Sequence, residues 1–195
     1  MFLNRQPLIL ASASPRRREM LSGLGIAFTV RPAAIVEEPR PGEKPAAFAA
    51  RLAEEKARAV AGHGPGSWVL AADTVVAVAD EILGKPADAA AAGAMLLRLS
   101  DRWHRVFSAF CLVRENEIHG EVVATEVRFA SASPELIAAY VATGEPLDKA
   151  GAYGIQGLGG VLVREIRGSH SNVIGLPLAE VVAALLALGV VACAP

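Results

Sequence analysis

The run from Trp68 to Ala79, WVLAADTVVAVA, constrains the fold most, because it is apolar and rich in β-branched residues. Such a run is typical of a central strand, or of a bent pair of strands. Asp73 and Thr74 interrupt it. A buried aspartate is costly unless it is paired, bound to a metal or directed into a cleft. We therefore interpret Asp73 as a candidate functional carboxylate. The alternative is a bulge or strand end at which Asp73 caps a neighbouring group.

A second informative stretch is Leu8–Leu24, LILASASPRRREMLSGL, which predicts a short strand, a polar loop and a helix. Ser14 suits the N-cap and Pro15 the first helical position. The N-terminus of a helix favours an anion, yet Arg16 and Arg17 place cations there against the helix dipole. A phosphate site explains these arginines, whereas a solvated basic edge is the alternative.

The string ASASP occurs twice, at 11–15 and at 130–134, and the second copy serves as an internal comparison. Glu135 follows it, so an acidic residue stands where the helix dipole favours one. The second copy therefore indicates ordinary capping, and capping alone does not require the arginines of the first copy.

Composition sets limits on the class of protein. A chain of 195 residues with a net charge of −1 suits one domain, or one domain of two lobes, with a sizeable core. This charge gives no case for nucleic-acid or membrane binding. Cys111 and Cys193 form no metal-binding motif, so we expect a reduced interior and no structural zinc. Residues 173–194 approach the length of a membrane span, but Pro177 and many alanines favour a buried helix over 177–188 instead.

The remaining pattern predicts alternating helices and strands. We expect helices over residues 45–61, 88–99 and 134–143, and strands over residues 28–32, 82–83, 103–113, 118–129 and 161–166, with 118–129 resembling an edge strand. The acidic loop 33–45 carries Glu37 and Glu38, for which a solvated surface is the simplest interpretation. Lys85 stands at the open end of the hairpin that follows Asp73, where its ammonium would meet an anionic ligand.

A glycine-rich stretch from Thr143 to Gly160, TGEPLDKAGAYGIQGLGG, matches neither the Walker A pattern nor a Rossmann fingerprint. Its glycines would permit close approach of the backbone to a ligand. Its polar side chains are Asp148, Lys149, Tyr153 and Gln156.

The candidate residues suit one kind of chemistry. They are Ser12, Arg16, Arg17, Glu37, Lys56, Asp73, Lys85 and Gln156. Carboxylates and cations without a histidine cluster suit Mg²⁺ or Mn²⁺ held together with substrate phosphates, rather than zinc. We therefore predict phosphoryl or nucleotidyl transfer, to water if the site holds no larger acceptor.

Five blocks in order carry a family resemblance: ASASPRRREML, AADTVV, ILGKP, DKAGAYGIQG and GSHSNVIGLPL. Together they resemble the Maf family of nucleoside triphosphate pyrophosphatases, from Leu8 to Leu178. The resemblance implies one domain over residues 1–195, a mixed α/β fold with an elongated central sheet flanked by helices, and two lobes around a cleft, as in inosine triphosphatase-like folds. It also implies a divalent metal, a cytoplasmic homodimer and a link to septum formation.

The resemblance assigns roles by position. Asp73 corresponds to the family's proposed proton acceptor, and Ser12, Arg16 and Arg17 match its phosphate-contacting motif. Lys56 and Lys85 match cationic positions, while Arg16, Thr74 and Gln156 fall on positions associated with base selectivity. Glu37 falls on the family glutamate, although Val36 stands where an aspartate is common. We take Asp73, Glu37 and Lys85 as catalytic and Asp73 and Glu37 as metal ligands, with activation of water and binding of the metal as alternative roles for Asp73.

The pair Asp73–Thr74 and the run AYGIQ resemble the branch that acts on dTTP and UTP. We therefore expect hydrolysis of these and of modified pyrimidine nucleotides to the monophosphate and pyrophosphate, with water attacking the α-phosphorus. The same chemistry on a methylated guanine nucleotide is one alternative. A nucleotide-binding regulator of septum formation without turnover is another. His170, Ser108 and Asp80–Glu81 depart from the family pattern, away from the expected phosphate and water-activating groups.

Overall fold

A computed structural model describes residues 1–62, 64 and 66–195. The chain divides into two compact units, Met1–Asp73 with Ser108–Val123 and Gly175–Pro195, and Thr74–Phe107 with Ala124–Ile174. Three long strands belong to both units: β4 (Trp68–Val78), β6 (Trp103–Arg114) and β7 (Glu117–Phe129). The main sheet has the order β3-β2-β4-β6-β7-β8, with β5 paired to β4. This mixed sheet with flanking helices confirms the predicted fold class.

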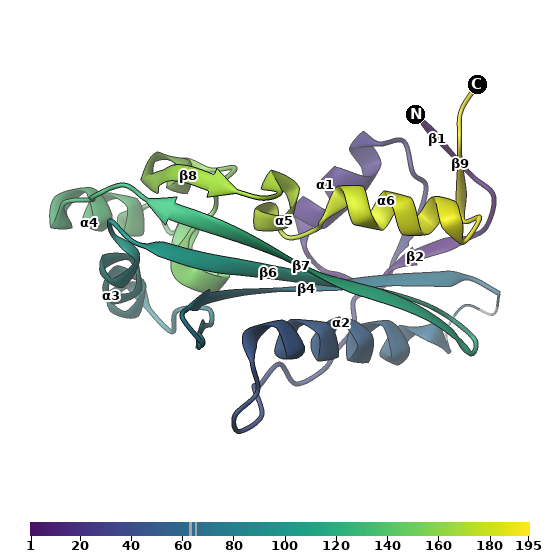
Figure 1. The fold of residues 1–195 in the computed structure, drawn as a ribbon, viewed down its shortest axis with the longest axis horizontal. Coiled ribbons are helices and arrows are strands. Elements are labelled where there is room, and N and C mark those ends of the chain that lie inside the picture. The colour runs from purple at the N-terminus through teal and green to yellow at the C-terminus, as the bar shows by residue number, and fades with distance from the viewer. Residues whose placement is uncertain (63, 65) are drawn as a thin grey trace. The chain divides into compact units, whose positions relative to one another are not determined.

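The first unit is built on β2 (Leu8–Leu10), which is parallel to both β3 (Thr29–Val30) and β4. Figure 1 shows α1 (Pro15–Gly23) and α6 (Leu178–Ala187) on one face of these strands and α2 (Pro45–Ala61) on the other. The strand predicted over 28–32 is shorter than expected. The side chains of the fully buried core include Leu10, Leu21, Trp68, Leu70, Phe110, Leu112 and Leu176.

The two chain ends pair in a way that the sequence did not reveal. β1 (Phe2–Asn4) and β9 (Val191–Cys193) form a separate antiparallel sheet in which Phe2 faces Cys193. The C-terminal helix agrees with its prediction, but the apolar tail after it is a strand. Among the helices that the structure describes, none has the length and apolar character needed to cross a membrane.

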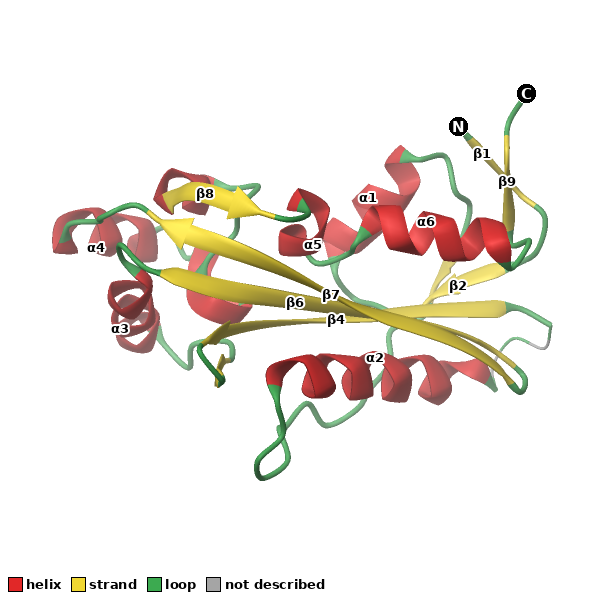
Figure 2. Cartoon of the chain, in the orientation of Figure 1, coloured by secondary structure: helices red, strands yellow, loops and turns green. Residues whose placement is uncertain are grey.

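The second unit contains β5 (Glu81–Leu83), which returns antiparallel to β4 as predicted. Figure 2 shows α3 (Ala89–Leu99) and α4 (Pro134–Ala142) side by side, and the two helices are in contact. β8 (Val163–Arg167) pairs with the last residues of β7, so the predicted edge character of β7 is wrong there. Helix α5 spans His170–Ile174, and short 3-10 helices span Glu145–Asp148, Ala150–Ala152 and Leu158–Leu162.

An aromatic cluster around His104 lies in the core of the second unit. His104 Nε2 is 2.9 Å from the hydroxyl of Tyr153, and the His104 ring meets the Phe129 ring edge-on with 4.9 Å between centroids. Burial lowers the pKa of His104 to about 4. The imidazole is therefore neutral in the folded protein at neutral pH and holds Tyr153 in place.

This burial makes stability depend on pH. The pKa of His104 is about 4 in the folded state and near 6.5 in the unfolded state, so the unfolded chain gains the proton first as pH falls. The wild type should lose up to about 3 kcal/mol of unfolding free energy between pH 6.5 and pH 4 through this residue. His104→Gln should flatten that pH dependence in urea unfolding, whereas His119→Gln, at an exposed position of β7, should not. Parallel curves for wild type and His104→Gln would contradict the assignment.

Candidate functional site

The predicted aspartate is buried and paired. Asp73 is 7% exposed, and its Oδ1 accepts a hydrogen bond of 2.6 Å from Lys56 Nζ. The same ammonium lies 2.6 Å from Glu37 Oε1. Strand β4, helix α2 and the loop before α2 therefore bring two carboxylates to one lysine. These are both predicted acidic residues and one of the predicted lysines.

The helical period of α2 explains why Lys56 faces inward. The buried stripe of this helix consists of Pro45, Phe48, Ala49, Leu52, Ala53, Lys56, Ala57 and Val60. Lys56 follows Leu52 by four residues and so lies on the same face. Its long aliphatic stem packs within that apolar face while its ammonium reaches Asp73 and Glu37.

Opposing effects set the pKa of Asp73. Burial raises it, the ion pair and hydrogen bond with Lys56 and the charge of Arg17 lower it, and Glu37 raises it again. The balance leaves the pKa of Asp73 above its ordinary value. A carboxylate with a raised pKa binds a proton more readily, which suits a general base.

The start of α1 is capped as predicted. Ser14 is the N-cap, its hydroxyl accepts from the Arg17 backbone N–H, and Pro15 begins the helix. The hydroxyl of Ser12 accepts from the Ser14 backbone N–H at 3.2 Å and from Arg17 Nη1 at 3.3 Å. Arg16 is partly buried, while Arg18 is exposed. The structure thus brings Ser12 and Arg17 into direct contact.

Arg17 also ties α1 to the strand that carries Asp73. Its Nη1 donates to the carbonyl of Ala72 and its Nε to the carbonyl of Gly175, each at 2.8 Å. Gly175 has φ of 127°, a conformation that favours glycine. Because Ala72 directly precedes Asp73, Arg17 fixes the backbone at the aspartate. Sequence reasoning missed this role, because the acceptors are backbone carbonyls that no motif distinguishes.

The other predicted residues belong to the second unit. Thr74 follows Asp73 in β4 and is partly buried, whereas Lys85 and Gln156 are exposed. The segment of Lys85 is joined to the glycine-rich stretch, since the carbonyl of Gly84 accepts from the backbone N–H of Gly151 at 3.2 Å. Within this unit, the structure therefore links the two loops that carry Lys85 and Gln156.

The glycine-rich stretch is organised around its own carboxylate. Glu145 accepts from the backbone N–H groups of Leu158 at 2.9 Å and Gly159 at 3.1 Å, and from the hydroxyl of Tyr140 at 2.8 Å. A Cβ atom at Gly159 would lie 2.5 Å from the Tyr140 hydroxyl, and one at Gly157 would collide with Glu145. Gly157 therefore makes room for Glu145, and Gly159 for its partner Tyr140. The expected approach of a ligand to this stretch stays a prediction.

Three of the four polar side chains expected to meet a ligand also have internal partners. Tyr153 is buried against His104. Lys149 Nζ donates to the Glu145 carbonyl at 2.7 Å and to Asp148 at 2.6 Å. The stretch is thus an internally bonded loop that presents Gln156 at its surface.

Glu145→Gln should destabilise the protein, because the new NH₂ group would replace one acceptor and face a backbone N–H. Leaving such donors unsatisfied costs about 1–3 kcal/mol. Chemical denaturation should reveal this loss, whereas Glu126→Gln, at an exposed position of β7, should change the unfolding free energy by less than about 0.5 kcal/mol. Equal stability of the Glu145 and Glu126 variants would refute this role.

Two relatives resemble the chain over nearly its whole length. A dTTP/UTP pyrophosphatase of Desulfotalea psychrophila is 53% identical over 188 residues, covering 95% of this chain and 96% of that protein. A dTTP/UTP pyrophosphatase of Myxococcus xanthus is 56% identical over 178 residues, covering 91% and 90%. A HAM1 protein structure from Coxiella burnetii aligns with a TM-score of 0.47 and 21% identity over 65% of this chain and 74% of its own. A family model described as Maf-like protein matches residues 7–188. The chain therefore belongs to the Maf-like protein family.

Proposed function

We propose that the protein hydrolyses nucleoside triphosphates, with dTTP and UTP as substrates, to the monophosphate and pyrophosphate. Relatives that are more than half identical bear the name dTTP/UTP pyrophosphatase, which supports this choice of substrates. The observation that carries the chemistry is Asp73, a buried carboxylate of raised pKa that shares Lys56 with Glu37. A buried ion pair in an apolar strand is often no more stable than apolar residues of the same size. The pair therefore indicates a role in function rather than in stability.

In the proposed reaction, water attacks the α-phosphorus and pyrophosphate leaves. A new P–O bond forms to the water oxygen as the bond to the bridging α–β oxygen breaks. Asp73 accepts the proton that the water gives up. Lys56 and Arg16 contribute positive charge that offsets the charge of the phosphates. Ser12 and Arg17, which contact each other at the start of α1, complete the proposed phosphate-binding region.

We propose Mg²⁺ or Mn²⁺ as the cofactor, with Glu37 and Asp73 as its ligands; for Asp73, holding the ion is the alternative to accepting the proton. The donor set fits, because these two carboxylates already meet at one cationic group, the ammonium of Lys56. Across residues 1–62, 64 and 66–195 no group of three or more His, Cys, Asp or Glu side chains is placed to hold a metal. Water and substrate phosphates would supply the remaining ligands, as is usual for Mg²⁺. When bound, the ion would add positive charge at the phosphates.

The remaining assignments rest on the family resemblance. We propose that Lys85 assists catalysis at the phosphates, that Arg16, Thr74 and Gln156 select the base, and that both units act as one domain over residues 1–195. A homodimer, a cytoplasmic location and a connection with septum formation stay predictions.

Asp73→Asn should reduce pyrophosphate release from dTTP and UTP by about 10²- to 10⁴-fold, because an amide does not accept the proton from water. Released pyrophosphate is measured with Mg²⁺ or Mn²⁺ present. Asp101→Asn, at an exposed position of the second unit, should retain wild-type rates. Equal rates for wild type and Asp73→Asn would exclude the mechanism, and tight nucleotide binding without product would favour the regulator of septum formation.

A panel of triphosphates should separate the pyrimidine substrates from a methylated guanine nucleotide. Gln156→Ala should narrow the difference in kcat/KM between UTP and the guanine nucleotide, while the free energy of unfolding stays the same because Gln156 is exposed. A preference of the wild type for the guanine nucleotide would exclude dTTP and UTP as the main substrates.

A further inference from the structure

The loop that carries Glu37 has no regular structure to hold it in position. Residues 31–44, between β3 and α2, contain no helix or strand. The Glu37 side chain is 43% exposed even though its carboxylate contacts Lys56. Besides the contact of Glu37 with Lys56, the contacts of neighbouring loop residues therefore bear on where Glu37 lies.

Arg51, on α2, contacts two residues of this loop, Glu43 and Glu38. Its Nε and Nη2 each lie 2.7 Å from one oxygen of Glu43, so the pair is bidentate. Nη2 also donates to the carbonyl of Glu38 at 3.0 Å. The second Glu43 oxygen accepts from the backbone N–H of Arg40 at 2.9 Å. One guanidinium thus joins both ends of the loop segment 38–43, and Glu38 is the immediate neighbour of Glu37.

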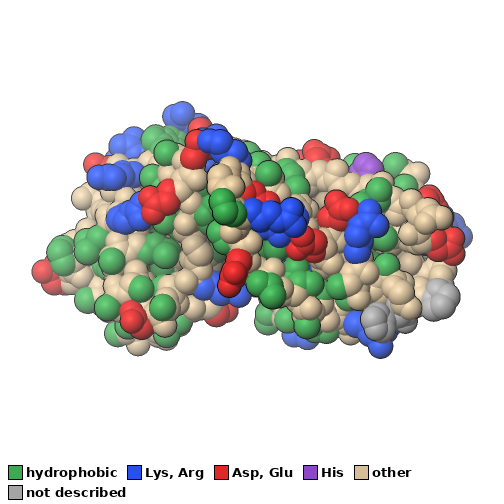
Figure 3. Space-filling model, turned by 90° about the horizontal axis from the view of Figure 1, so that it is seen from below, with side chains coloured by type: hydrophobic (Ala, Val, Ile, Leu, Met, Phe, Trp, Pro, Cys, Tyr) green, Lys and Arg blue, Asp and Glu red, His purple; other side chains and the backbone are tan. Residues whose placement is uncertain are grey.

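The Arg51–Glu43 pair differs from the exposed pairs of this helix. The Arg51 and Glu43 side chains are 15% and 10% exposed, whereas Arg58 and Glu54 are 56% and 44% exposed. Figure 3 shows exposed charges of both signs interspersed on one face of the molecule, and such pairs contribute little. Hydrogen bonds from Arg51 hold the pKa of Glu43 at about 2. Shielded, bidentate pairs are stronger and more specific in geometry.

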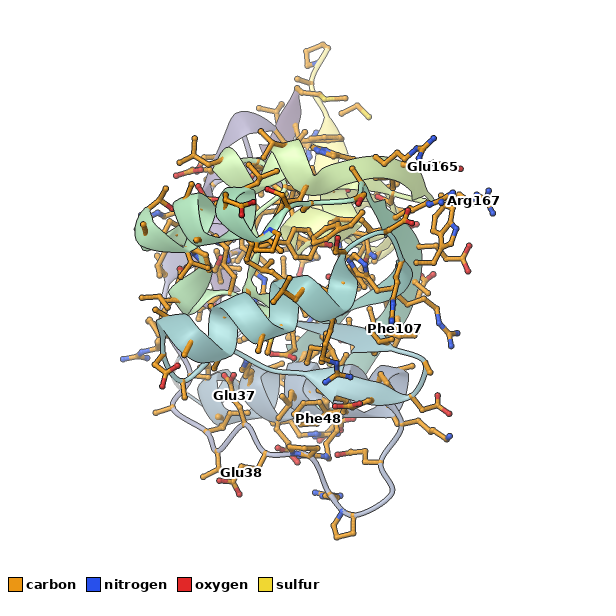
Figure 4. The ribbon with its side chains drawn as sticks, turned by 90° about the vertical axis from the view of Figure 1, so that its left-hand side faces the viewer. Glu37, Glu38, Phe48, Phe107, Glu165 and Arg167 are labelled. Atoms are coloured by element: carbon orange, nitrogen blue, oxygen red, sulfur yellow. The ribbon has the colours of Figure 1, made fainter. Side chains whose placement is uncertain are left out.

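We propose that Arg51 and Glu43 are positioning residues that hold the loop so that Glu37 reaches Lys56. Figure 4 shows Glu37 and Glu38 on the loop in the same region of the molecule as Phe48 on α2. The Arg51 guanidinium also belongs to this region, because it lies 5.3 Å from the Phe48 ring centroid. Arg51 and Lys56 belong to one helix, so the group that fixes the loop and the lysine that Glu37 contacts share a rigid frame. The effect on activity rests on the proposed function of Glu37.

The alternative is that Arg51 only stabilises helix α2, since Arg51 also forms an ion pair of 3.2 Å with Glu55, four residues later in the same helix. Arg51→Lys separates the two roles. A lysine retains the charge for Glu55, but a single ammonium does not reproduce the fork that joins Glu43 and Glu38. We call the contacts of Arg51 with Glu43 and with the Glu38 carbonyl the clamp. Glu43→Gln tests the clamp from the loop side, and Arg58→Lys on the exposed face of α2 is the matched control.

Amide hydrogen exchange tests the clamp independently of catalysis. Arg51→Lys and Glu43→Gln should speed exchange in residues 33–44 and leave the amides of residues 52–60 in α2 unchanged. Arg58→Lys should alter neither region. Unchanged exchange in the loop, or faster exchange in loop and helix together, would overturn the proposal.

Kinetics then test whether the clamp acts through Glu37. Arg51→Lys should lower kcat/KM for dTTP by about tenfold or more, as loss of residues that orient ligands commonly does. In a Glu37→Gln background the same substitution should cause no further loss, whereas additive losses would overturn action through Glu37. A fully active Glu37→Gln variant would refute the proposed role of Glu37, while the exchange result would still decide whether the clamp exists.

Discussion

The ion pair between Lys56 and Asp73 is the constraint on which the first unit depends. Lys56 and Asp73 are each less than a tenth exposed and have lost most of their hydration. Their 2.6 Å contact compensates for this loss, together with Glu37 beside Lys56 and the charge of Arg17. Strand β4 therefore tolerates an aspartate only while α2 holds its lysine at that point. Removing either partner alone leaves a buried charge, so the packing of α2 on β4 and the chemistry of the site are inseparable.

The cations of this unit divide their work according to their chemistry. The guanidinium groups of Arg17 and Arg51 are planar and each donates several hydrogen bonds, to backbone carbonyls and, for Arg51, to a carboxylate. These bonds fix both the position and the orientation of the strand and the loop that they contact. Lys56 places a single charged point between two carboxylates on different elements. The arginines thus determine where the strand and the loop lie, and the lysine balances the charge that these segments bring together.

Parts of this arrangement follow from the sequence. Asp73 is conspicuous because it interrupts an apolar run. The burial of Lys56 is not predicted, because most helical lysines are exposed, although its position four residues after Leu52 is consistent with the buried face. The pairing of β1 with β9 and the carbonyl partners of Arg17 do not follow, because they depend on backbone atoms that all residues share. The glycine-rich stretch is ambiguous for a related reason, since a loop around an internal carboxylate and a loop around a ligand need the same small residues, and the contacts of Glu145 account for part of the pattern.

The buried and partly buried carboxylates suit different tasks because their surroundings move their pKa values in opposite directions. Burial raises the pKa of Glu145, but hydrogen bonds from the Gly159 and Leu158 amides and the Tyr140 hydroxyl, with the charge of Lys149, bring it below its ordinary value. Glu145 thus stays ionised and serves as a fixed acceptor. For Asp73, burial outweighs the nearby cations and the pKa rises. Environments that separate the pKa values of carboxylates are how one protein assigns them different roles. By this criterion Asp73 is the better proton acceptor of the two, and Glu145 the better structural anchor.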